Sequence, residues 1–437
     1  MDERSMRMIL LGQNDEKDIL IESDQLIARE DIERSASLLG SDAIKVIFGV
    51  RRSGKSTLAH QFLADKEYAY INFDDERLVG IDRYDLDRLF QIAKGIAGGS
   101  GYALFDEIQN IDGWELFVNR LQREGVDLTV TGSSANLLST ELSTHLTGRY
   151  LPISLLPFSF REFLLAKRIS VPDLGSLRSA DVELLAGSAE EYLRLGGFPK
   201  AVLDPDNASL YLRTLYSDII NKDVIVRFKP KYTRTLRELS LFLINSSSNL
   251  MTYSSLMKRF DLGSIHTVKN YVHYLVEASL LVIVEKFTFR QRERSASPKK
   301  VYSVDTGLVQ LLSSSPGDPI ANLLENAVAV DLFRRASFDP ALSINYWRNY
   351  QDHEVDLVLS RDRKVEKLIQ VSAISELDGL RERETRSLVR ASRELKCSHL
   401  LLITWNLEGR IEEKGMEIEM VPFWKWTLFP DLVPSLK

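Results

Sequence analysis

The sequence predicts an α/β protein with a parallel sheet near its N-terminus and further domains after it. Short apolar runs, such as the β-branched run 43–48 and the run 102–105, alternate with segments whose apolar residues recur at helical spacing. A glycine-rich stretch, 49–56, lies between one such run and one such segment. A chain of 437 residues is too long for one ordinary core, so we expect several domains.

Composition limits the class of protein and its compartment. The formal net charge is −6, with 44% hydrophobic and 27% charged residues, as in soluble globular proteins. No run approaches the roughly 18 uninterrupted apolar residues of a membrane helix, and the N-terminus lacks the apolar core of a signal peptide. We therefore expect a cytoplasmic protein without membrane contact. The single cysteine, Cys397, excludes an internal disulfide and a cysteine-based zinc site.

The stretch Gly49–Ser56 reads Gly-Val-Arg-Arg-Ser-Gly-Lys-Ser and fits the P-loop pattern G-x-x-x-x-G-K-[ST]. Backbone N–H groups of such a loop and the positive end of the following helix can surround phosphate oxygens. We expect Lys55 to reach the β- and γ-phosphates and Ser56 to offer its hydroxyl to Mg²⁺. The predicted ATP-binding residues are Gly49, Arg51, Arg52, Ser53, Gly54, Lys55, Ser56 and Thr57. The two arginines could equally face solvent or another subunit.

A second motif supplies two acids at the end of a predicted strand. Asp106 and Glu107 follow the apolar run 102–105, and the carboxyl ends of parallel strands are where α/β sheets bind ligands. We expect Asp106 to hold Mg²⁺ through water and Glu107 to polarise the water that attacks the γ-phosphate. The alternative is a strand that ends in ordinary acids, which the P-loop some fifty residues upstream disfavours.

Two further residues are candidates for catalysis. The predicted strand 127–132 is followed by Ser133, which could sense the γ-phosphate or orient the water, although Ser134 could simply cap the next helix. Arg149 precedes a fifth predicted strand and could act as an arginine finger, in cis or on a neighbouring subunit. The second arrangement requires a homo-oligomer, and a structural salt bridge is an equally good interpretation of Arg149.

Residues 236–287 show the order of a winged helix. Helices are predicted at 236–244, 253–260 and 265–278, and a strand at 280–287. The run 286–300 holds six positive residues against one acid and would form the wing. The predicted DNA contacts are Lys269, Lys286, Arg290, Arg292 and Arg294. Many winged helices mediate only protein contacts, and that alternative stays open.

The ordered motifs together resemble a known family. They are Gly49–Ser56, Phe-Asp-Glu-Ile-Gln (105–109), Thr-Gly-Ser-Ser (131–134), Gly-Arg-Tyr (148–150), Leu-Pro-Phe-Ser-Phe-Arg-Glu-Phe (156–163) and Gly-Gly-Phe-Pro (196–199). This set is similar to the archaeal and bacterial P-loop ATPase family related to AAA+ and STAND NTPases. The resemblance implies a P-loop NTPase sheet of the additional-strand class, with Glu107 as the catalytic acid, and a restriction-endonuclease-like C-terminal domain.

With this resemblance we expect five parts of the chain. They are an N-terminal lead-in (1–40), a P-loop ATPase core (41–165), a helical lid (166–234), a winged helix (235–299) and a restriction-endonuclease-like domain (300–437).

The last domain departs from the pattern of active nucleases. The resemblance places Glu325 and Asp356 at acidic positions, with Glu354 two residues from Asp356 on the same strand face. Gln370 and Ser372 stand where an acid and a lysine are expected, so a metal ligand and a cation are missing. Lys364 or Lys367 could substitute from a shifted position. We therefore expect a vestigial nuclease site in a binding or scaffold domain.

These observations predict a Mg²⁺-dependent ATPase that couples ATP binding and hydrolysis to the binding or remodelling of duplex or branched DNA. One alternative is a STAND-like signalling switch with a protein partner, in which the winged helix is an internal brake. The other is an ATP-regulated nuclease that uses Glu325 and Asp356.

Overall fold

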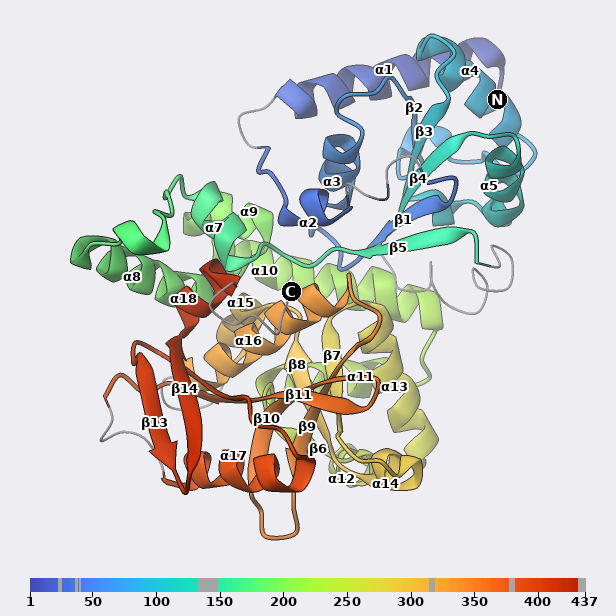
Figure 1. The fold of residues 1–437 in the computed structure, drawn as a ribbon. Coiled ribbons are helices and arrows are strands. Elements are labelled where there is room, and N and C mark those ends of the chain that lie inside the picture. Colours follow the sequence, from blue (N-terminus) through green and yellow to red (C-terminus); the bar gives the residue numbers. More distant parts are fainter. Residues whose placement is uncertain are drawn as a thin grey trace. The chain divides into compact units, whose positions relative to one another are not determined.

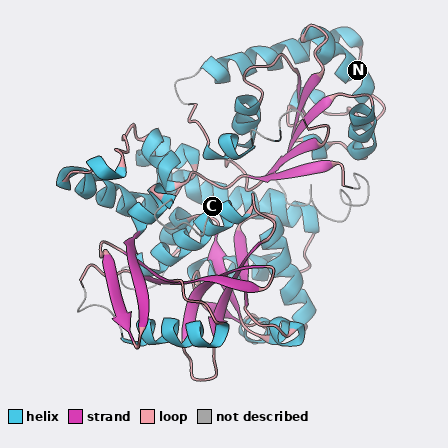
Figure 2. Cartoon of the chain, viewed as in Figure 1, coloured by secondary structure: helices cyan, strands magenta, loops and turns pink. Residues whose placement is uncertain are grey.

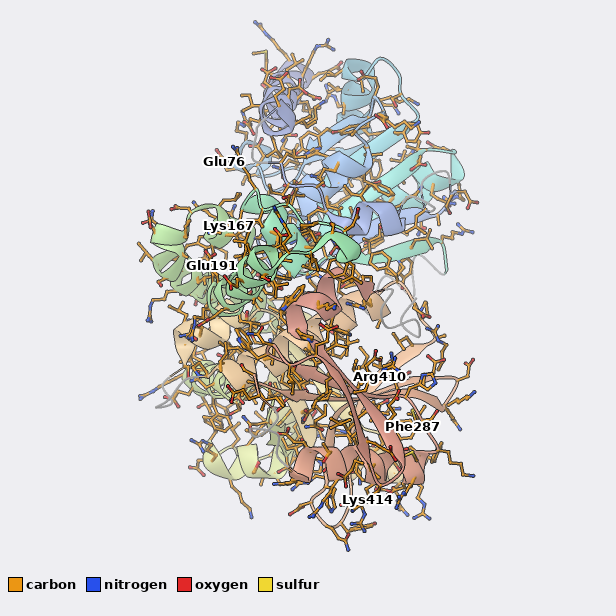
Figure 3. All side chains as sticks on the ribbon, turned by 60° about the vertical axis from the view of Figure 1, so that its left-hand side comes forward. Glu76, Lys167, Glu191, Phe287, Arg410 and Lys414 are labelled. Atoms are coloured by element: carbon orange, nitrogen blue, oxygen red, sulfur yellow. The ribbon has the colours of Figure 1, made fainter. Side chains whose placement is uncertain are left out.

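The structure is a computed structural model, and its elements and side chains are drawn in Figure 1, Figure 2 and Figure 3. It describes residues 1–22, 26–35, 38, 41–132, 148–313, 319–376 and 382–430. The chain divides into two compact units. The first comprises Met1–Leu156 with Glu277–Ser279, and the second comprises Pro157–Val276 with Leu280–Lys437.

The first unit is a five-stranded parallel sheet with helices, in the strand order β2-β3-β4-β1-β5. Its elements are α1 (Glu3–Glu22), α2 (Glu30–Ser35), β1 (Ile44–Phe48), α3 (Lys55–Phe62), β2 (Ala69–Asn72), α4 (Leu86–Ile96), β3 (Tyr102–Asp106), α5 (Trp114–Arg123), β4 (Asp127–Gly132) and β5 (Tyr150–Ser154). Strand β4 lies between β1 and β3, so one strand separates the P-loop strand from the strand that ends in the two acids. Because all five strands are parallel, their carboxyl ends form one edge of the sheet.

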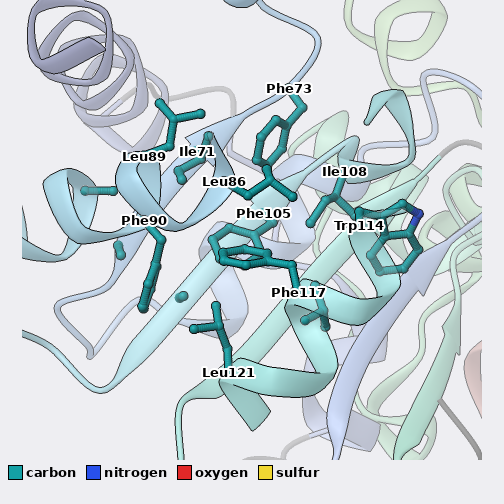
Figure 4. Packing of buried hydrophobic residues seen from close by; sticks show 14 of the residues in the cluster. Ile71, Phe73, Leu86, Leu89, Phe90, Phe105, Ile108, Trp114, Phe117 and Leu121 are labelled. Atoms are coloured by element: carbon teal, nitrogen blue, oxygen red, sulfur yellow. The ribbon is translucent and has the colours of Figure 1, made fainter. Parts of the chain in front are cut away.

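An aromatic cluster anchors the strand that carries these acids. The ring of Phe105 on β3 lies 6.1 Å from Phe73, 6.0 Å from Phe90 and 5.7 Å from Phe117, measured between ring centroids. Figure 4 shows these rings packed between the sheet and helices α4 and α5. Burial of a phenylalanine side chain contributes about 2 kcal/mol, so β3 is firmly held. On α5, Phe117 and Leu121 are buried in this cluster, whereas Leu116 is 62% exposed.

The N-terminal lead-in belongs to this unit. Helix α1 packs against α4 and β2, with Met6 and Leu10 fully buried. The Gln13 side chain pairs with the backbone of Asn72, donating through Nε2 to its carbonyl and accepting from its N–H, both at 3.0 Å. The first helix therefore covers the sheet rather than preceding the folded core.

The second unit combines helices with a mixed nine-stranded sheet, in the order β13-β14-β12-β11-β10-β9-β7-β8-β6. Its helices are α7 (Phe160–Ala166), α8 (Ser179–Leu195), α9 (Pro199–Leu203), α10 (Ala208–Asp218), α11 (Thr233–Asn245), α12 (Tyr253–Arg259), α13 (Ile265–Glu277), α14 (Gln291–Ala296), α15 (Thr306–Leu312), α16 (Ile320–Ala336), α17 (Glu382–Leu395) and α18 (Phe423–Leu428). Its strands are β6 (Leu250–Met251), β7 (Leu281–Lys286), β8 (Lys299–Ser303), β9 (Leu342–Arg348), β10 (Glu354–Arg361), β11 (Lys364–Ser372), β12 (Leu400–Thr404), β13 (Gly409–Glu413) and β14 (Met416–Pro422).

The segments expected as winged helix and nuclease-like domain share this sheet. Strand β7 pairs with β8 on one side and, in parallel, with β9 on the other, through Glu285 opposite Asn345. The expected domain boundary after residue 299 falls inside β8. One sheet therefore contains strands from both segments, which we expected to be separate domains.

The Gly-Gly-Phe-Pro segment has a structural role in the second unit. The buried carboxylate of Asp305 accepts the N–H of Gly197 at 2.6 Å and that of Leu308 at 3.2 Å. A Cβ on Gly196, whose φ is +81°, would lie 2.2 Å from Asp305 Oδ1. Burial raises the pKa of Asp305 to about 6. These glycines let the end of α8 approach the start of α15.

None of the described helices is both long and apolar enough to cross a lipid bilayer.

Candidate active site

The P-loop adopts backbone conformations that its glycines make possible. Gly49 follows β1 with φ +153°, and a Cβ at this position would lie 2.1 Å from the carbonyl oxygen of Leu155. Arg52 and Gly54 also have positive φ values, 65° and 97°. The loop then enters α3 at Lys55. This arrangement leaves room for phosphate oxygens to approach backbone N–H groups at the start of the helix.

Lys55 is buried and folded back over the loop. Its Nζ donates to the carbonyl oxygens of Gly49 at 3.3 Å and Val50 at 3.2 Å. The same nitrogen lies 3.9 Å from Glu107 Oε1. The ammonium group therefore stands between the loop and the catalytic acid predicted from the sequence.

Asp106 is held by hydroxyl groups from two other elements. Thr131 Oγ1, at the end of β4, donates to Asp106 Oδ1 and accepts the N–H of Glu107 at 3.1 Å. The Ser56 side chain also hydrogen-bonds to Asp106. Burial raises the pKa of Asp106, while these two hydrogen bonds and the charge of Lys55 act to lower it. The predicted magnesium ligands Ser56 and Asp106 are thus in contact.

Glu107 adopts a left-handed backbone conformation at the end of β3, with φ 52°. Its Oε2 accepts a hydrogen bond from Gln109 Nε2. Burial raises the pKa of Glu107, and the charges of Lys55 and Arg51 oppose that shift. A carboxylate with a raised pKa is a better proton acceptor, which suits a general base.

The structure does not place every predicted catalytic residue at this edge. Ser133 lies outside the described residues. Arg149 directly precedes β5, and its carbonyl oxygen accepts the N–H of Ile44 at the start of β1, at 2.9 Å. Strand β1 spans five residues, or roughly 17 Å, so Arg149 lies at the sheet edge opposite the P-loop. This position argues against an arginine finger acting in cis.

Two residues at the site were not predicted. Thr131 connects both acids, and Arg29 is a buried side chain that donates to the carbonyl oxygens of Ser53 at 2.8 Å and Leu156 at 2.7 Å. The alternation of strand residues would have placed Thr129 and Thr131 on one face of β4. No pattern in the sequence distinguishes Arg29, because its partners are main-chain atoms far along the chain.

The residues present fit a magnesium-bound nucleotide. Ser53 Oγ is fully buried and has no hydrogen-bond partner within the described part of the chain, so the loop retains an unused polar atom. Ser56 and Asp106 offer hard oxygen ligands, which is the donor type that Mg²⁺ prefers. Magnesium usually takes few protein ligands and completes its shell with water and substrate phosphates.

Comparisons with known proteins agree with this geometry. The model of a family described as AAA domain matches residues 41–164, and that of a domain of unknown function (DUF8612) matches 187–318. The uncharacterized protein MJ1544 of Methanocaldococcus jannaschii is 34% identical over 402 residues, which cover 88% of either chain. The chain belongs to the family of MJ1544. This family member therefore carries an AAA-type P-loop ATPase domain.

Relatives occur in bacteria as well as archaea. An uncharacterized protein of Haemophilus influenzae is 30% identical over 418 residues, which cover 92% of this chain and 99% of that protein. Among solved structures, the Walker-type ATPase paby2304 of Pyrococcus abyssi aligns with 65% of this chain and 95% of its own, with 13% identity and a TM-score of 0.40.

A second cluster of charged residues lies in the other unit of this family member. The Nζ atom of Lys300, on β8, lies 3.0 Å from Glu325 Oε1, 2.9 Å from Glu354 Oε1 and 2.8 Å from Asp356 Oδ1. The Lys300 side chain is 1% exposed. Tyr302, also on β8, donates its hydroxyl to Glu325 Oε1 at 2.8 Å. One ammonium group thus occupies the space between three carboxylates.

The remaining predicted residues of the nuclease-like site lie beside this cluster. Gln370 Nε2 donates to Asp356 Oδ2 at 2.6 Å, and the N–H of Val371 donates to the same oxygen at 3.0 Å. Ser372 is buried two residues beyond Gln370 on β11. Burial, with the neighbouring charge of Asp356, raises the pKa of Glu325 to about 7, and Lys300 opposes the shift.

The expectation that this site lacks a cation is corrected. Lys300 supplies the positive charge from a strand that precedes all three acids in the sequence. Lys367 cannot do so because it is three residues from Gln370 and so lies on the opposite face of β11. Lys364 stands at the exposed start of the same strand. Within the described residues, no group of three or more histidine, cysteine and acidic side chains is arranged to hold a metal.

The predicted DNA contacts have different surroundings. The run 286–300, which is expected to form the wing, contains the short helix α14. Lys286 pairs with Glu293 at 2.9 Å, and Arg294 forms an ion pair with Glu285. The positive charge of these two side chains is therefore largely balanced by one acid within the run and one directly before it. The other three predicted contacts, Lys269, Arg290 and Arg292, are exposed.

Thr131→Val tests whether the hydroxyl between the two acids matters for catalysis. The valine keeps the shape of the side chain but removes the donor to Asp106 and the acceptor for the N–H of Glu107. Loss of such a supporting partner typically lowers activity about 10- to 100-fold. We expect a fall of that size in kcat for Mg²⁺-dependent ATP hydrolysis, measured by phosphate release.

Thr129→Val is the matched control. Thr129 is on the same strand, and its buried hydroxyl has no hydrogen-bond partner in the described part of the chain. This substitution should leave kcat near that of the wild type. Equal kcat values for the two variants would show that Thr131 only fills space.

Proposed function

We propose that this protein is a Mg²⁺-dependent ATP hydrolase whose nucleotide cycle controls how its second unit engages DNA. The observation that carries the hydrolase assignment is the meeting of Lys55, Asp106 and Glu107 at the carboxyl edge of the parallel sheet. No other part of the described chain combines a P-loop with two acids at the end of another strand of the same sheet. The phosphate chain of ATP is the ligand that this combination suits.

The proposed chemistry assigns a task to each group. Lys55 exchanges its contacts with the Gly49 and Val50 carbonyl oxygens for the β- and γ-phosphates. Ser56 and Asp106 would hold Mg²⁺, which neutralises phosphate charge when it is bound. Glu107 accepts a proton from the attacking water, so that the oxygen of that water bonds to the γ-phosphorus as the β–γ bond breaks. Arg149 would serve only the site of a neighbouring copy.

The order of helices and strands in the second unit supports DNA binding. Helices α11, α12 and α13 are followed by the β7–β8 hairpin, with β6 as the third strand, which is the order of a winged helix. Helix α13 buries Val268 and Leu275 and exposes Lys269 and Asn270. Exposed polar side chains on a third helix are suited to contact phosphates or a groove.

In this proposal the cluster around Lys300 stabilises the second unit and does not cleave DNA. In nucleases of the restriction-endonuclease type, acids of this kind hold Mg²⁺. Here the Lys300 ammonium is within hydrogen-bond distance of all three acids and takes the place where a cation would be held. A buried lysine with this many carboxylate contacts stays protonated, since they raise its pKa well above the usual value.

Lys286 and Arg294 form ion pairs with acids of the same unit, which leaves less positive charge for DNA. This observation favours a second candidate function, a signalling switch with a protein partner. In that case the helices α11–α13 would contact protein instead of DNA. The two candidates differ in what stimulates hydrolysis.

The experiment measures ATP hydrolysis by the purified full-length chain with Mg²⁺ in the presence of single-stranded, duplex and branched DNA, scoring DNA cleavage in the same tubes. We expect one DNA form to stimulate hydrolysis without being cut. Basal hydrolysis without stimulation by any DNA form would favour the signalling switch. Cleavage of DNA would overturn the scaffold role of the Lys300 cluster.

A further inference from the structure

The side chain of Arg29 joins the P-loop to the segment that follows strand β5. Arg29 is 3% exposed, its Nη1 donates to the carbonyl oxygen of Ser53 at 2.8 Å, and its Nη2 donates to that of Leu156 at 2.7 Å. These two acceptors are 24 and 127 residues away in the sequence. A Cβ added to Gly54 would lie 3.3 Å from Arg29 Nη1, so the guanidinium lies directly against the loop.

The start of the P-loop contacts the same segment. The N–H of Leu155 donates to the carbonyl oxygen of Phe48, the last residue of β1, at 2.7 Å. A Cβ on Gly49, the first residue of the loop, would lie 2.1 Å from the carbonyl oxygen of Leu155. The loop is therefore tied to this segment near both of its ends. A change in the loop backbone must either move the segment or break one of these contacts.

This segment is where the chain passes from the first unit to the second, after Leu156. The next carbonyl oxygen, that of Pro157, accepts a hydrogen bond at 2.6 Å from Nη2 of Arg334, a side chain of α16 that is 2% exposed. The N–H of Phe158 then donates to the carbonyl oxygen of Gly197 at 2.7 Å. Two buried arginines, one from each unit, thus hold two successive carbonyl groups. We call residues 155–158 the joint.

The joint has little conformational freedom of its own. The ring of Pro157 fixes its φ angle and disfavours the helical region for Leu156. A guanidinium group presents its donors in one rigid plane. A shift of the Ser53 carbonyl therefore tilts the same group that holds the carbonyl of Leu156.

The carbonyl of Ser53 belongs to a peptide group that the P-loop uses. It forms one planar unit with the N–H of Gly54, and the two bonds point in opposite directions. A guanidinium on the oxygen therefore fixes the direction of this N–H, which lies at the start of α3. N–H groups at this place are those that a P-loop turns toward phosphate oxygens. The positive charge on the oxygen also polarises the peptide group and strengthens the N–H as a donor.

Nucleotide binding would act on this loop. Lys55 now donates to the carbonyl oxygens of Gly49 and Val50, and in the proposed hydrolase it exchanges these contacts for phosphates. The carbonyl of Ser53 can keep Arg29 as its partner, because phosphate and guanidinium bind opposite ends of one peptide group. A bound phosphate and the contact of Arg29 with the joint thus favour the same orientation of that group.

We propose that Arg29 is a positioning residue, which directs the N–H of Gly54 toward bound phosphate and couples this peptide group to the joint. The inference rests on the nucleotide binding of the proposed function and adds the route by which the loop acts on the chain that leads to the second unit. Coupling of this kind is reciprocal, so a joint that is held in place strengthens nucleotide binding.

The test is hydrogen exchange of the full-length chain, measured by mass spectrometry with and without Mg²⁺ and adenylyl imidodiphosphate, an ATP analogue that is not hydrolysed. The fragment 155–160 reports on the joint. Arg29→Lys keeps the positive charge but replaces a planar fork of donors by one nitrogen. The matched control is Lys45→Met, which removes a buried ammonium that donates to the Ser41 carbonyl at 2.6 Å and to Asp127 at 2.8 Å, at the amino end of β1.

In the wild type, the saturating analogue should slow exchange of the fragment 155–160 at least about fivefold, since coupling between two sites is typically about 5- to 150-fold. Arg29→Lys should lose this slowing. It should also bind a fluorescent ATP analogue about 10- to 100-fold more weakly, the effect of losing a hydrogen bond to a charged group. Lys45→Met should keep the slowing even if its thermal midpoint falls.

Three results would overturn the inference. Unchanged exchange of the fragment 155–160 in a wild type that binds the fluorescent analogue would do so and would leave the proposed function intact, whether or not the variants fold. Equal slowing in the wild type and in Arg29→Lys would show that Arg29 only stabilises the fold. Loss of the slowing in Lys45→Met as well would show that any buried cation of this unit has the effect. A wild type that binds no analogue would contradict the proposed function and this inference together.

Discussion

Replacement of Glu107 by glutamine should abolish ATP turnover while ATP remains bound. The amide keeps the size and the hydrogen-bonding ability of the side chain but cannot accept a proton from water. A positioned general base contributes about 10²- to 10⁴-fold to a reaction rate, so kcat should fall at least 100-fold. Lys55 would also lose the carboxylate that now lies 3.9 Å from its Nζ, which should leave ATP affinity unchanged or higher.

The measurement pairs phosphate release with binding of a fluorescent ATP analogue. Lys55→Ala should lose nucleotide binding itself, which separates a binding residue from a catalytic one. Glu124→Gln, which removes a surface carboxylate 2.8 Å from Arg120, is the control and should hydrolyse ATP as the wild type does. A Glu107→Gln variant with a kcat within threefold of wild type would remove Glu107 from the catalytic role.

The main part of this site could be predicted because its geometry is encoded locally. The P-loop is contiguous, and its flanking strand and helix fix where Lys55 and Ser56 point. The acids Asp106 and Glu107 end an apolar strand, which parallel pairing then brings to the same sheet edge. Thr131 was missed because the sequence does not show which hydroxyl residue at the end of this strand reaches the acids, and Ser133 was chosen instead.

The second unit was less predictable for the same reason. The expected nuclease pattern places an acid and a lysine two residues apart on one strand. Lys300 instead comes from another strand, 25 residues before Glu325 in the sequence, so this pattern cannot identify it. The charge distribution around Lys300 depends on how the strands pair, and only the residue alternation of a strand gives a partial signal of it in the sequence.

Replacement of Lys300 by methionine should strongly destabilise the second unit. The ammonium is buried and lies within 3.0 Å of oxygens from Glu325, Glu354 and Asp356. Removing one partner of a buried ion pair leaves uncompensated charge and costs about 3–5 kcal/mol. The free energy of unfolding, measured by urea denaturation at pH 8, should fall by this amount. Lys299→Met is the control, because Glu285 would keep its ion pair with Arg294 and the loss should be smaller.

The loss should depend on pH in a defined direction. Glu325 has a folded-state pKa of about 7, above its ordinary value, so its contribution to stability is present at low pH and is lost as the pH rises toward 7. Without the ammonium this pKa rises further, and the loss continues to higher pH. The destabilisation by Lys300→Met should therefore be smaller at pH 5 than at pH 8, and adding Glu325→Gln and Asp356→Asn should recover part of it. A loss that is the same at both pH values would show that Lys300 acts by packing and not as the cation of this cluster.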